Sequence, residues 1–396
     1  MAEMLIVREF NVETDITAVE ELERLCEVGP SGKTSIYTDF MGDPICRIRH
    51  SPAYLMLVAE YGAGKEIVGV IRGSIKTVTR GKKPFNELPI YAKVAYILGL
   101  RVSPNHRRLG IGTKLVEKME EWCKQQGAEY AYMATDRANE ASINLFTLKC
   151  AYTRFRSPTV LVHPVHAHRK RLSRDTAILR LSPPLAESIY RRLFSSSEFF
   201  PRDIDAVLAN RLTLGTFMAL PKAHLPKWDP LSGRLPPSYA ILSVWNCMDV
   251  FKLQVKGMSP LTYAWCVGSR LLDEWMPWLR IPSVPDVFRP FGVYVMYGLQ
   301  MEGKSGGKLM RELCSFVHNM AAEEEGCAAV VAEVGRRDPV RTAVPHWQRL
   351  SWAEDVWCMK RLVGEEGEEG CCGGGSDDWV RTRPSSPVVF VDPRDF

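Results

Sequence analysis

The sequence lacks the segments with which a chain is exported or crosses a membrane. Its first residues, MAEMLIVREFNVETD, have no basic flank and no long apolar centre, and no apolar run reaches the roughly 18 residues of a spanning helix. It also lacks any CxxC pair, and its eleven cysteines follow no regular spacing. We therefore expect reduced thiols in the nucleus or cytoplasm, with no secretion and no membrane contact.

A large excess of one charge is missing as well. The 51 basic and 46 acidic residues give a net charge of +5, which is too even a balance to predict a nucleic-acid-binding protein. The hydrophobic share of 46% is typical of a folded protein, and a length of 396 residues favours two domains. Sequence-specific nucleic-acid binding is therefore not expected, whereas self-association stays open.

The first half of the chain alternates strand-like and helix-like segments. Period-two alternation predicts strands, and apolar residues at three- and four-residue spacing predict helices. The order is β-α-β-β-β-α-β-α-β-β, which predicts a mixed, mostly antiparallel α/β fold. The expected strands are 5–10, two around a turn at 62–65 within 54–78, 93–102, 130–135, 152–163 and 176–181, and the expected helices start at 16, 111 and 139.

Two local sequence features mark boundaries along the chain. Pro183 and Pro184 cannot continue a central strand, so we place a domain boundary after residue 181 and assign the two domains to 1–181 and 182–363. The run GEEGEEGCCGGGSDD has almost nothing to bury, so residues 364–396 are expected to form a flexible tail.

A weak internal repeat links the two halves. Residues 111–137 and 306–337 both read as a glycine-bearing turn, an amphipathic helix, a strand and a polar junction. The second domain is therefore predicted to be a degenerate copy of the first.

The junction RRLGIGTKL, residues 107–115, carries the clearest chemical signal. It lies between a strand and a helix, where the unpaired N–H groups of the first helical turn form an anion site. Gly110 and Gly112 have no Cβ and let a phosphate approach the main chain, while Arg107 and Arg108 add positive charge. Leu115 stands where GxGxxG would require a third glycine, and the preceding strands form hairpins, so a dinucleotide fold is not expected.

The pattern Arg-x-x-Gly-x-Gly, after a strand ending LRVSP and before a helix, a strand and an Asn-bearing helix, resembles the GCN5-related N-acetyltransferase (GNAT) superfamily. The amino-acid sequence from residue 107 onward is most similar to the plant hookless-type N-acetyltransferases, and this similarity extends through the second half of the chain. The resemblance implies acetyl-CoA as cosubstrate, no metal, and a protein acceptor. It also implies a nuclear role in hormone-dependent plant growth, through ethylene and auxin signalling. The implied cofactor-binding residues are Leu100, Arg101, Val102, Arg107, Arg108, Leu109, Gly110, Ile111, Gly112, Thr113, Asn139 and Phe146.

The proton-handling residues of that family are not at their usual places. The strand AYILGLRV contains no carboxylate, and Phe146 stands where family members often have a tyrosine, so it cannot protonate the leaving CoA thiolate. Tyr152, Tyr96 and Glu60 are the candidate catalytic residues. Asp136 and His106 are further candidates, and solvent can also protonate a thiolate of pKa about 8.5.

Three further motifs compete with this interpretation. GLQMEGKS at 298–305 matches a phosphate-binding loop for ATP or GTP, although few residues follow it to complete such a fold. His163, His166 and His168 are close in sequence, but no carboxylate or cysteine stands at ligand spacing, so no metal site is expected. Arg169, Lys170, Arg171 and Arg174 form a basic stretch that is either an import or acidic-partner patch or a solvated face.

The resemblance implies N-acetyl transfer from acetyl-CoA to an amine, with a histone-like protein lysine as the expected acceptor. The alternative is a catalytically weak acyl-CoA-binding scaffold, and the minor alternative is a nucleotide-binding protein.

Overall fold

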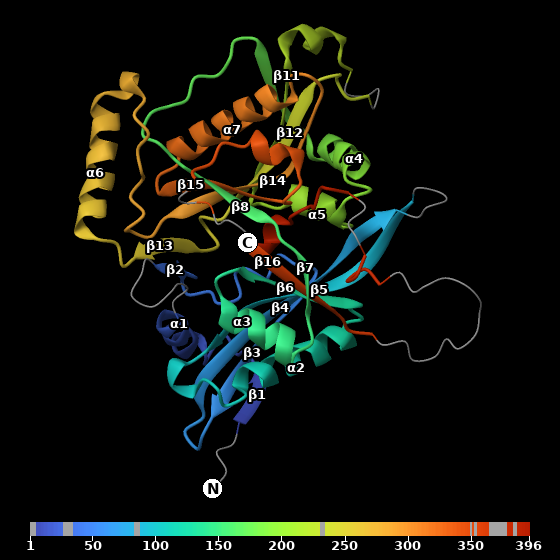
Figure 1. Ribbon diagram of the computed structural model, residues 1–396, viewed down its shortest axis with the longest axis vertical. Coiled ribbons are helices and arrows are strands. Elements are labelled where there is room, and N and C mark those ends of the chain that lie inside the picture. Colours follow the sequence, from blue (N-terminus) through green and yellow to red (C-terminus); the bar gives the residue numbers. More distant parts are fainter. Residues whose placement is uncertain are drawn as a thin grey trace.

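The computed structural model of the protein describes residues 5–26, 35–82, 88–229, 234–348, 351, 355–363, 378–382 and 386–396. Two mixed sheets lie one above the other, each with helices on its faces (Figure 1). Among the described residues no helix is long and apolar enough to cross a bilayer. The described cysteines are all buried free thiols.

The first sheet has the order β1-β3-β4-β5-β6-β16-β7, and β10 pairs with β4 outside this path. All its pairs are antiparallel except β5 with β6. Helix α2, Ile111–Gln125, covers one face together with α3, Glu140–Asn144, and the π-helix Leu145–Lys149, while α1, Ile16–Leu25, covers the other. The strands are β1 Leu5–Glu9, β3 Ala53–Tyr61, β4 Glu66–Lys82, β5 Pro89–Val102, β6 Tyr130–Asp136, β7 Thr153–Arg156, β10 Glu198–Pro201 and β16 Asp355–Arg361.

The second sheet has the order β8-β15-β14-β12-β11-β9, with only β14 and β15 parallel. Helix α7, Gly306–Glu323, covers one face, and α4, Pro183–Leu193, with α5, Ile204–Ala209, covers the other. Helix α6, Pro260–Trp275, stands at the side of this lobe (Figure 1). The strands are β8 Thr159–Pro164, β9 Thr176–Leu181, β11 Thr213–Pro221, β12 Tyr239–Asn246, β14 Gly292–Glu302 and β15 Cys327–Val334, and a separate ribbon pairs β2 Ser35–Asp39 with β13 Lys252–Lys256.

The two halves of the chain exchange strands, which the sequence did not predict. Strands β8 and β9 were expected to complete the first half but belong to the second sheet, whereas β16, from the second half, lies between β6 and β7 of the first. Alternation identifies a strand but not its partner, because pairing is decided by tertiary contacts far apart in sequence. The boundary after residue 181 therefore does not separate the two sheets.

The internal repeat is visible in the backbone. β5-α2-β6 and β14-α7-β15 are both parallel strand pairs joined by one long helix. Each first strand carries a bulge with a left-handed glycine, Gly99 at φ 62° and Gly298 at φ 60°. The shared bulge supports a second, GNAT-like copy of the first unit, as the sequence predicted.

The expected flexible tail is packed wherever it is described. Trp379, Phe390 and Val391 are buried in the cores of both lobes, and Asp392 and Arg394 are buried and paired. The prediction is wrong for 378–382 and 386–396 because a few apolar and charged side chains find matching partners there. The glycine- and glutamate-rich run at 364–377 lies outside the described residues.

Candidate functional site

Strands β5 and β6 separate from each other at the middle of the first sheet. Their parallel ladder has three rungs and ends at the pair Tyr96 and Tyr132. Beyond it, β5 continues on β4 alone and β6 on β16 alone. A bulge between the pairs Arg72–Leu98 and Val70–Arg101 puts one extra residue into β5, bending it at Gly99. The result is a V-shaped separation of the two strands, in which the β5 backbone from residue 97 to 102 has no ladder partner on the β6 side.

A buried arginine holds this bulge in place. The Arg72 guanidinium is 1% exposed and donates from Nε to the Pro44 carbonyl at 2.6 Å and from Nη1 to Glu23 at 2.8 Å. Glu23 also forms an ion pair with Arg101 at 3.3 Å. Helix α1 is therefore tied by one carboxylate to both ends of the bulge, so that the open strand edge is fixed rather than loose.

The turn after β5 leads into an uncapped helix. Arg107, Arg108 and Gly110 are exposed, and Arg108 and Gly110 have φ values of 65° and 79°. No side chain caps α2, whose first closing bond runs from the Lys114 N–H to the Gly110 carbonyl at 3.0 Å. The N–H groups of residues 111–113 precede that bond and are the unpaired donors of a helix start. These exposed donors have the arrangement that the sequence predicts for an anion site.

The two glycines of the motif differ in what they do. A Cβ on Gly110 would meet nothing within 4 Å, so the space beside the turn is open. A Cβ on Gly112 would lie 3.3 Å from Leu145, 3.7 Å from Val102 and 3.9 Å from Leu100. Gly110 therefore keeps room for a ligand at a left-handed position, and Gly112 lets the helix pack closely on the end of β5.

The other implied binding residues take local structural roles. The Asn139 side chain caps α3 by accepting from the Ser142 N–H at 3.2 Å, and it donates to Thr135 of β6 at 3.1 Å. Phe146 is 1% exposed in the π-helix and packs edge-on against Tyr152. Leu109 is half exposed on the turn, and Ile111 and Thr113 lie in the first turn of α2.

The three candidate catalytic residues are not brought together. Tyr152 is buried beneath α2 near Glu120 and Lys360, and burial raises the pKa of its hydroxyl well above the usual range. Glu60, at the end of β3, accepts from Arg8 of β1 at 2.7 Å. Tyr96 alone lies at the point where β5 and β6 separate, and burial followed by the charge of Asp395 raises its pKa.

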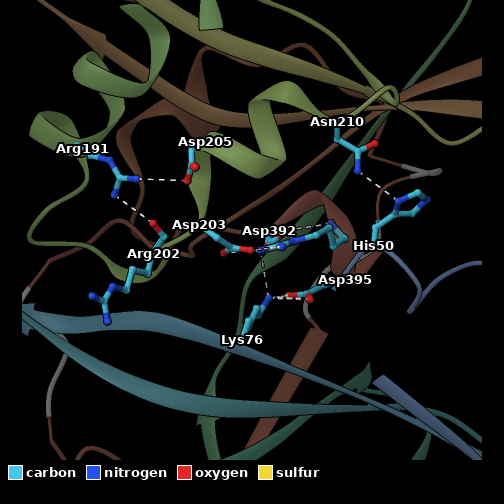
Figure 2. Close-up of polar contacts among 10 residues, drawn as sticks. His50, Lys76, Arg191, Arg202, Asp203, Asp205, Asn210, Asp392 and Asp395 are labelled. Atoms are coloured by element: carbon cyan, nitrogen blue, oxygen red, sulfur yellow. Dashed lines mark hydrogen bonds and ion pairs between the residues drawn. The ribbon is translucent and has the colours of Figure 1, made fainter. Parts of the chain in front are cut away.

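A residue group that the sequence did not predict meets Tyr96 at this point. Tyr96 stacks on Tyr132, whose hydroxyl donates to Asp395 at 2.8 Å. Lys76 of β4 forms an ion pair with Asp395 at 2.6 Å and with Asp392 at 3.5 Å (Figure 2). Burial raises the pKa of Asp395, with Lys76 opposing the shift and Asp392 adding to it. No motif marks the segment VVFVDPRDF beyond its short apolar run.

Further carboxylates face the same region from the second lobe and from β16. Burial raises the pKa of Glu333 well above its usual range, and Asp355 and Asp395 add to the shift. Burial and the neighbouring Asp136 raise the pKa of Asp355 to about 6. Asp395, Glu333 and Asp355 all act to raise the pKa of Tyr96, and Arg47 acts to lower it. The end of the V therefore has an acidic surrounding.

The C-terminal residues connect both lobes at this place. Arg394 forms ion pairs with Asp392 at 2.7 Å and with Asp203, beside α5, at 2.6 Å. Burial works to raise the pKa of Asp392, but Arg394 and Lys76 outweigh it and hold that pKa well below the usual range. Lys76, the segment 392–395 and Asp203 thus form one charge network across the interface.

The corresponding V of the second sheet is filled. The β14–β15 ladder ends at Met296 and Ala332, and residues 388–391 line the space beyond it together with Tyr297, Gly298 and Glu333. That space has a volume of about 10 Å³, too little for a cofactor arm. The second unit is therefore closed by the chain itself.

The phosphate-loop interpretation of GLQMEGKS is wrong. Gly298 and the four residues after it continue β14 to Glu302, so the loop that the motif requires does not form. Gly303, at φ 79°, lets the chain pass close to the Pro237 carbonyl. Packing and backbone geometry, rather than phosphate binding, account for both glycines.

Comparisons with known proteins agree with this geometry. A model of the Acetyltransferase (GNAT) family matches residues 16–152. "Probable N-acetyltransferase HLS1" of Arabidopsis thaliana is 51% identical, over 99% of this chain and 100% of its own length. "Acetyl transferase GW6a" of Oryza sativa subsp. japonica is 43% identical, over 100% of this chain and 98% of its own length.

Two solved structures share the fold across both lobes. Saccharomyces cerevisiae N-myristoyltransferase with bound myristoyl-CoA superposes with a TM-score of 0.54 at 8% identity, covering 90% of this chain and 79% of that one. A tandem GNAT protein from the clavulanic acid biosynthesis pathway gives a TM-score of 0.50 at 12% identity, covering 92% of this chain and all of that one. The chain therefore belongs to the GNAT family of N-acetyltransferases, in the group of the plant HLS1-type proteins.

Proposed function

We propose that the protein transfers the acetyl group of acetyl-CoA to the amine of a protein lysine. The observation that carries the proposal is the V between β5 and β6, with the exposed donor turn 107–113 at its mouth. The turn suits the pyrophosphate, and the unpaired β5 edge at residues 100–102 suits the amides of the pantetheine arm. Gly110 leaves the required space open.

The acidic surrounding of the V supports a cationic acceptor. A free lysine has a pKa near 10.4 and arrives as an ammonium ion, which the carboxylates of Asp395 and Asp355 attract. The amine must lose a proton before it attacks the thioester carbonyl. In this proposal Asp395 takes that proton, because its carboxylate lies at the end of the V and its pKa is raised.

The departing thiolate needs no dedicated acid. A thiolate of pKa about 8.5 leaves readily and can take its proton from solvent, or from Tyr96 beside the V. Tyr152 lies beneath α2 with a strongly raised pKa, which favours a packing role for its ring. The Phe146 substitution is compatible with turnover for the same reason.

Transfer of labelled acetyl groups tests the function. The full chain is incubated with labelled acetyl-CoA and a panel of histones, lysine peptides and polyamines, beside the variant Gly110→Trp. Gly62→Trp is the matched control, since Gly62 has φ 74°, has equally open surroundings and lies in a distant hairpin. We expect protein-lysine labelling that Gly110→Trp abolishes and Gly62→Trp preserves.

One observation favours the alternative, an acyl-CoA-binding scaffold. The Asp395 carboxylate already accepts a hydrogen bond from the Tyr132 hydroxyl and forms an ion pair with Lys76, so it is engaged before any amine arrives. Tight acetyl-CoA binding without turnover on any acceptor would establish the scaffold and overturn the enzyme. Failure to bind acetyl-CoA would contradict both.

The similarity to the hookless-type proteins extends the proposal to nuclear regulation of hormone-dependent growth in plants. A fluorescent fusion expressed in plant cells should accumulate in the nucleus. Complementation of a hookless-type mutant by the wild-type chain, and not by Gly110→Trp, should link that role to acetyl-CoA.

A further inference from the structure

Three buried histidines meet on the α7 side of the second lobe. His163 lies at the end of β8, His166 in the loop after it, and His318 on α7, 152 residues away from His166. Their ring centroids are 5.2 to 5.6 Å apart, and one nitrogen from each lies within 4.8 Å of the others. All three side chains are more than nine-tenths buried. From the sequence, His168 groups with His163 and His166 and no metal site is expected; in the structure His168 pairs with Asp273 at 2.7 Å.

The hydrogen bonds leave ligand atoms available. The Nδ1 atom of His163 is buried with no hydrogen-bond partner. Nδ1 of His166 lies 2.8 Å from the Ser283 carbonyl, which fixes its proton there and leaves Nε2 with a free lone pair. Nε2 of His318 accepts the His166 N–H at 2.9 Å, a single bond that a metal would have to replace.

Burial disfavours the protonated form of all three rings. Burial, followed by Lys170, lowers the pKa of His163 to about 2. Burial is also the main cause that lowers the pKa of His166 to about 4 and that of His318 to about 3. Neutral imidazole is the form that binds a metal. Lys170 contacts Nε2 of His163. Its positive charge is the nearest one that would repel a cation bound by the histidines.

We propose that His163, His166 and His318 bind one divalent cation of the zinc class, with water in the fourth position. Three imidazoles without carboxylates suit Zn²⁺ rather than Ca²⁺ or Mg²⁺. Tetrahedral bonds of about 2.05 Å separate ligand nitrogens by about 3.3 Å, so small ring rotations close the present spacing.

The metal would join three parts of the second lobe. It connects β8 and the loop 165–168 to α7, and the same loop holds α6 through Asp273, which accepts from the Ala167 N–H at 3.0 Å and from Ser283. Metal binding would therefore stabilise the attachment of α6. This role is independent of acetyl transfer.

Cobalt binding to the full chain, purified without a histidine tag and stripped with a chelator, tests the site. Titrated Co²⁺ should give the visible absorption of tetrahedral cobalt at one equivalent, and Zn²⁺ should displace it. His163→Gln and His318→Ala should each weaken binding at least about a hundredfold. His50→Ala is the matched control. His50 lies away from the three histidines and hydrogen-bonds to Asn210, so its loss should leave cobalt binding unchanged.

A second readout guards against variants that fail to fold. Zn²⁺ should raise the melting temperature of the wild type and of His50→Ala, but not that of His163→Gln. Absence of the cobalt bands in the folded wild type would overturn the proposal. So would bands whose intensity the His163 and His318 variants leave unchanged while circular dichroism reports a native fold.

Discussion

Tyr96 and Tyr132 stack with ring centroids 4.8 Å apart on the last rung of the parallel ladder between β5 and β6. The Tyr132 hydroxyl binds Asp395, so the point where the two strands separate is also the point where the C-terminal segment docks. The V between β5 and β6 and the interface between the lobes therefore share one pair of rings.

Replacing Asp395 should separate chemistry from binding. In Asp395→Asn the side chain keeps its shape but cannot take a proton from the amine. We expect the acetylation kcat to fall by about 10²- to 10⁴-fold with little change in the Kd of acetyl-CoA. Asp205→Asn, at an exposed ion pair with Arg191, is the control. An unchanged kcat in Asp395→Asn would remove Asp395 from the mechanism.

Lys76 should be needed for stability. It is 2% exposed and neutralises two buried carboxylates, so Lys76→Met leaves charge uncompensated in the interface. We expect a loss of about 3–5 kcal/mol in the free energy of unfolding, measured with denaturant. Lys118→Met breaks only an exposed pair with Glu121 and should cost less than about 0.5 kcal/mol. Equal losses in both variants would contradict this account.

The bulge glycine should tolerate no side chain. Gly99 has φ 62°, and a Cβ there would lie 2.6 Å from Nη1 of the buried Arg72. Gly99→Ala should cost roughly 2–4 kcal/mol, from backbone strain and from displacement of Arg72, and should weaken acetyl-CoA binding. Gly127→Ala has a similar φ of 75° but a nearest contact of 3.9 Å, so it isolates the strain alone. Calorimetric melting and cofactor titration measure the two effects.

Acid should remove the contribution of one ion pair. The guanidinium of Arg8 hydrogen-bonds to Asp15 and lowers the pKa of that carboxyl to about 2. A carboxyl with a lowered folded-state pKa stabilises the fold above its unfolded pKa of about 3.9, and this contribution is lost as the pH falls towards 2.

Asp15→Asn should therefore cost on the order of 1–2 kcal/mol at pH 7, after screening at the partly exposed Arg8, and close to nothing near pH 2. Denaturant unfolding of both forms across this range measures the difference. A gap that does not narrow on acidification would show that the loss at pH 7 comes from something other than charge.

The local parts of the site were predictable, and the long-range parts were not. The roles of Gly110, Gly112 and the exposed arginines could be predicted because the strand-to-helix junction that holds them is a local feature of about ten consecutive residues. Asp395 and Lys76 are 319 residues apart, and no spacing rule connects them. His318 was missed for the same reason.

Because the two halves exchange strands, the sequence predicted where strands lie but not which sheet they join. Alternation marked residues 152–163 as strand, and the structure divides this stretch into β7 and β8 in different sheets. The partner that decides the sheet of β8, β15, comes more than 160 residues later. The tail was misjudged because composition averages over a segment, whereas burial of Trp379 and Phe390 depends on single side chains.

The strand exchange also sets the order in which the protein can be completed. The first sheet receives β16 at residues 355–361, so the ribosome must have translated nearly the whole chain before that sheet can close between β6 and β7. Residues 1–181 on their own would expose the unpaired edges of both strands. The two lobes of this chain therefore have to be expressed and engineered together.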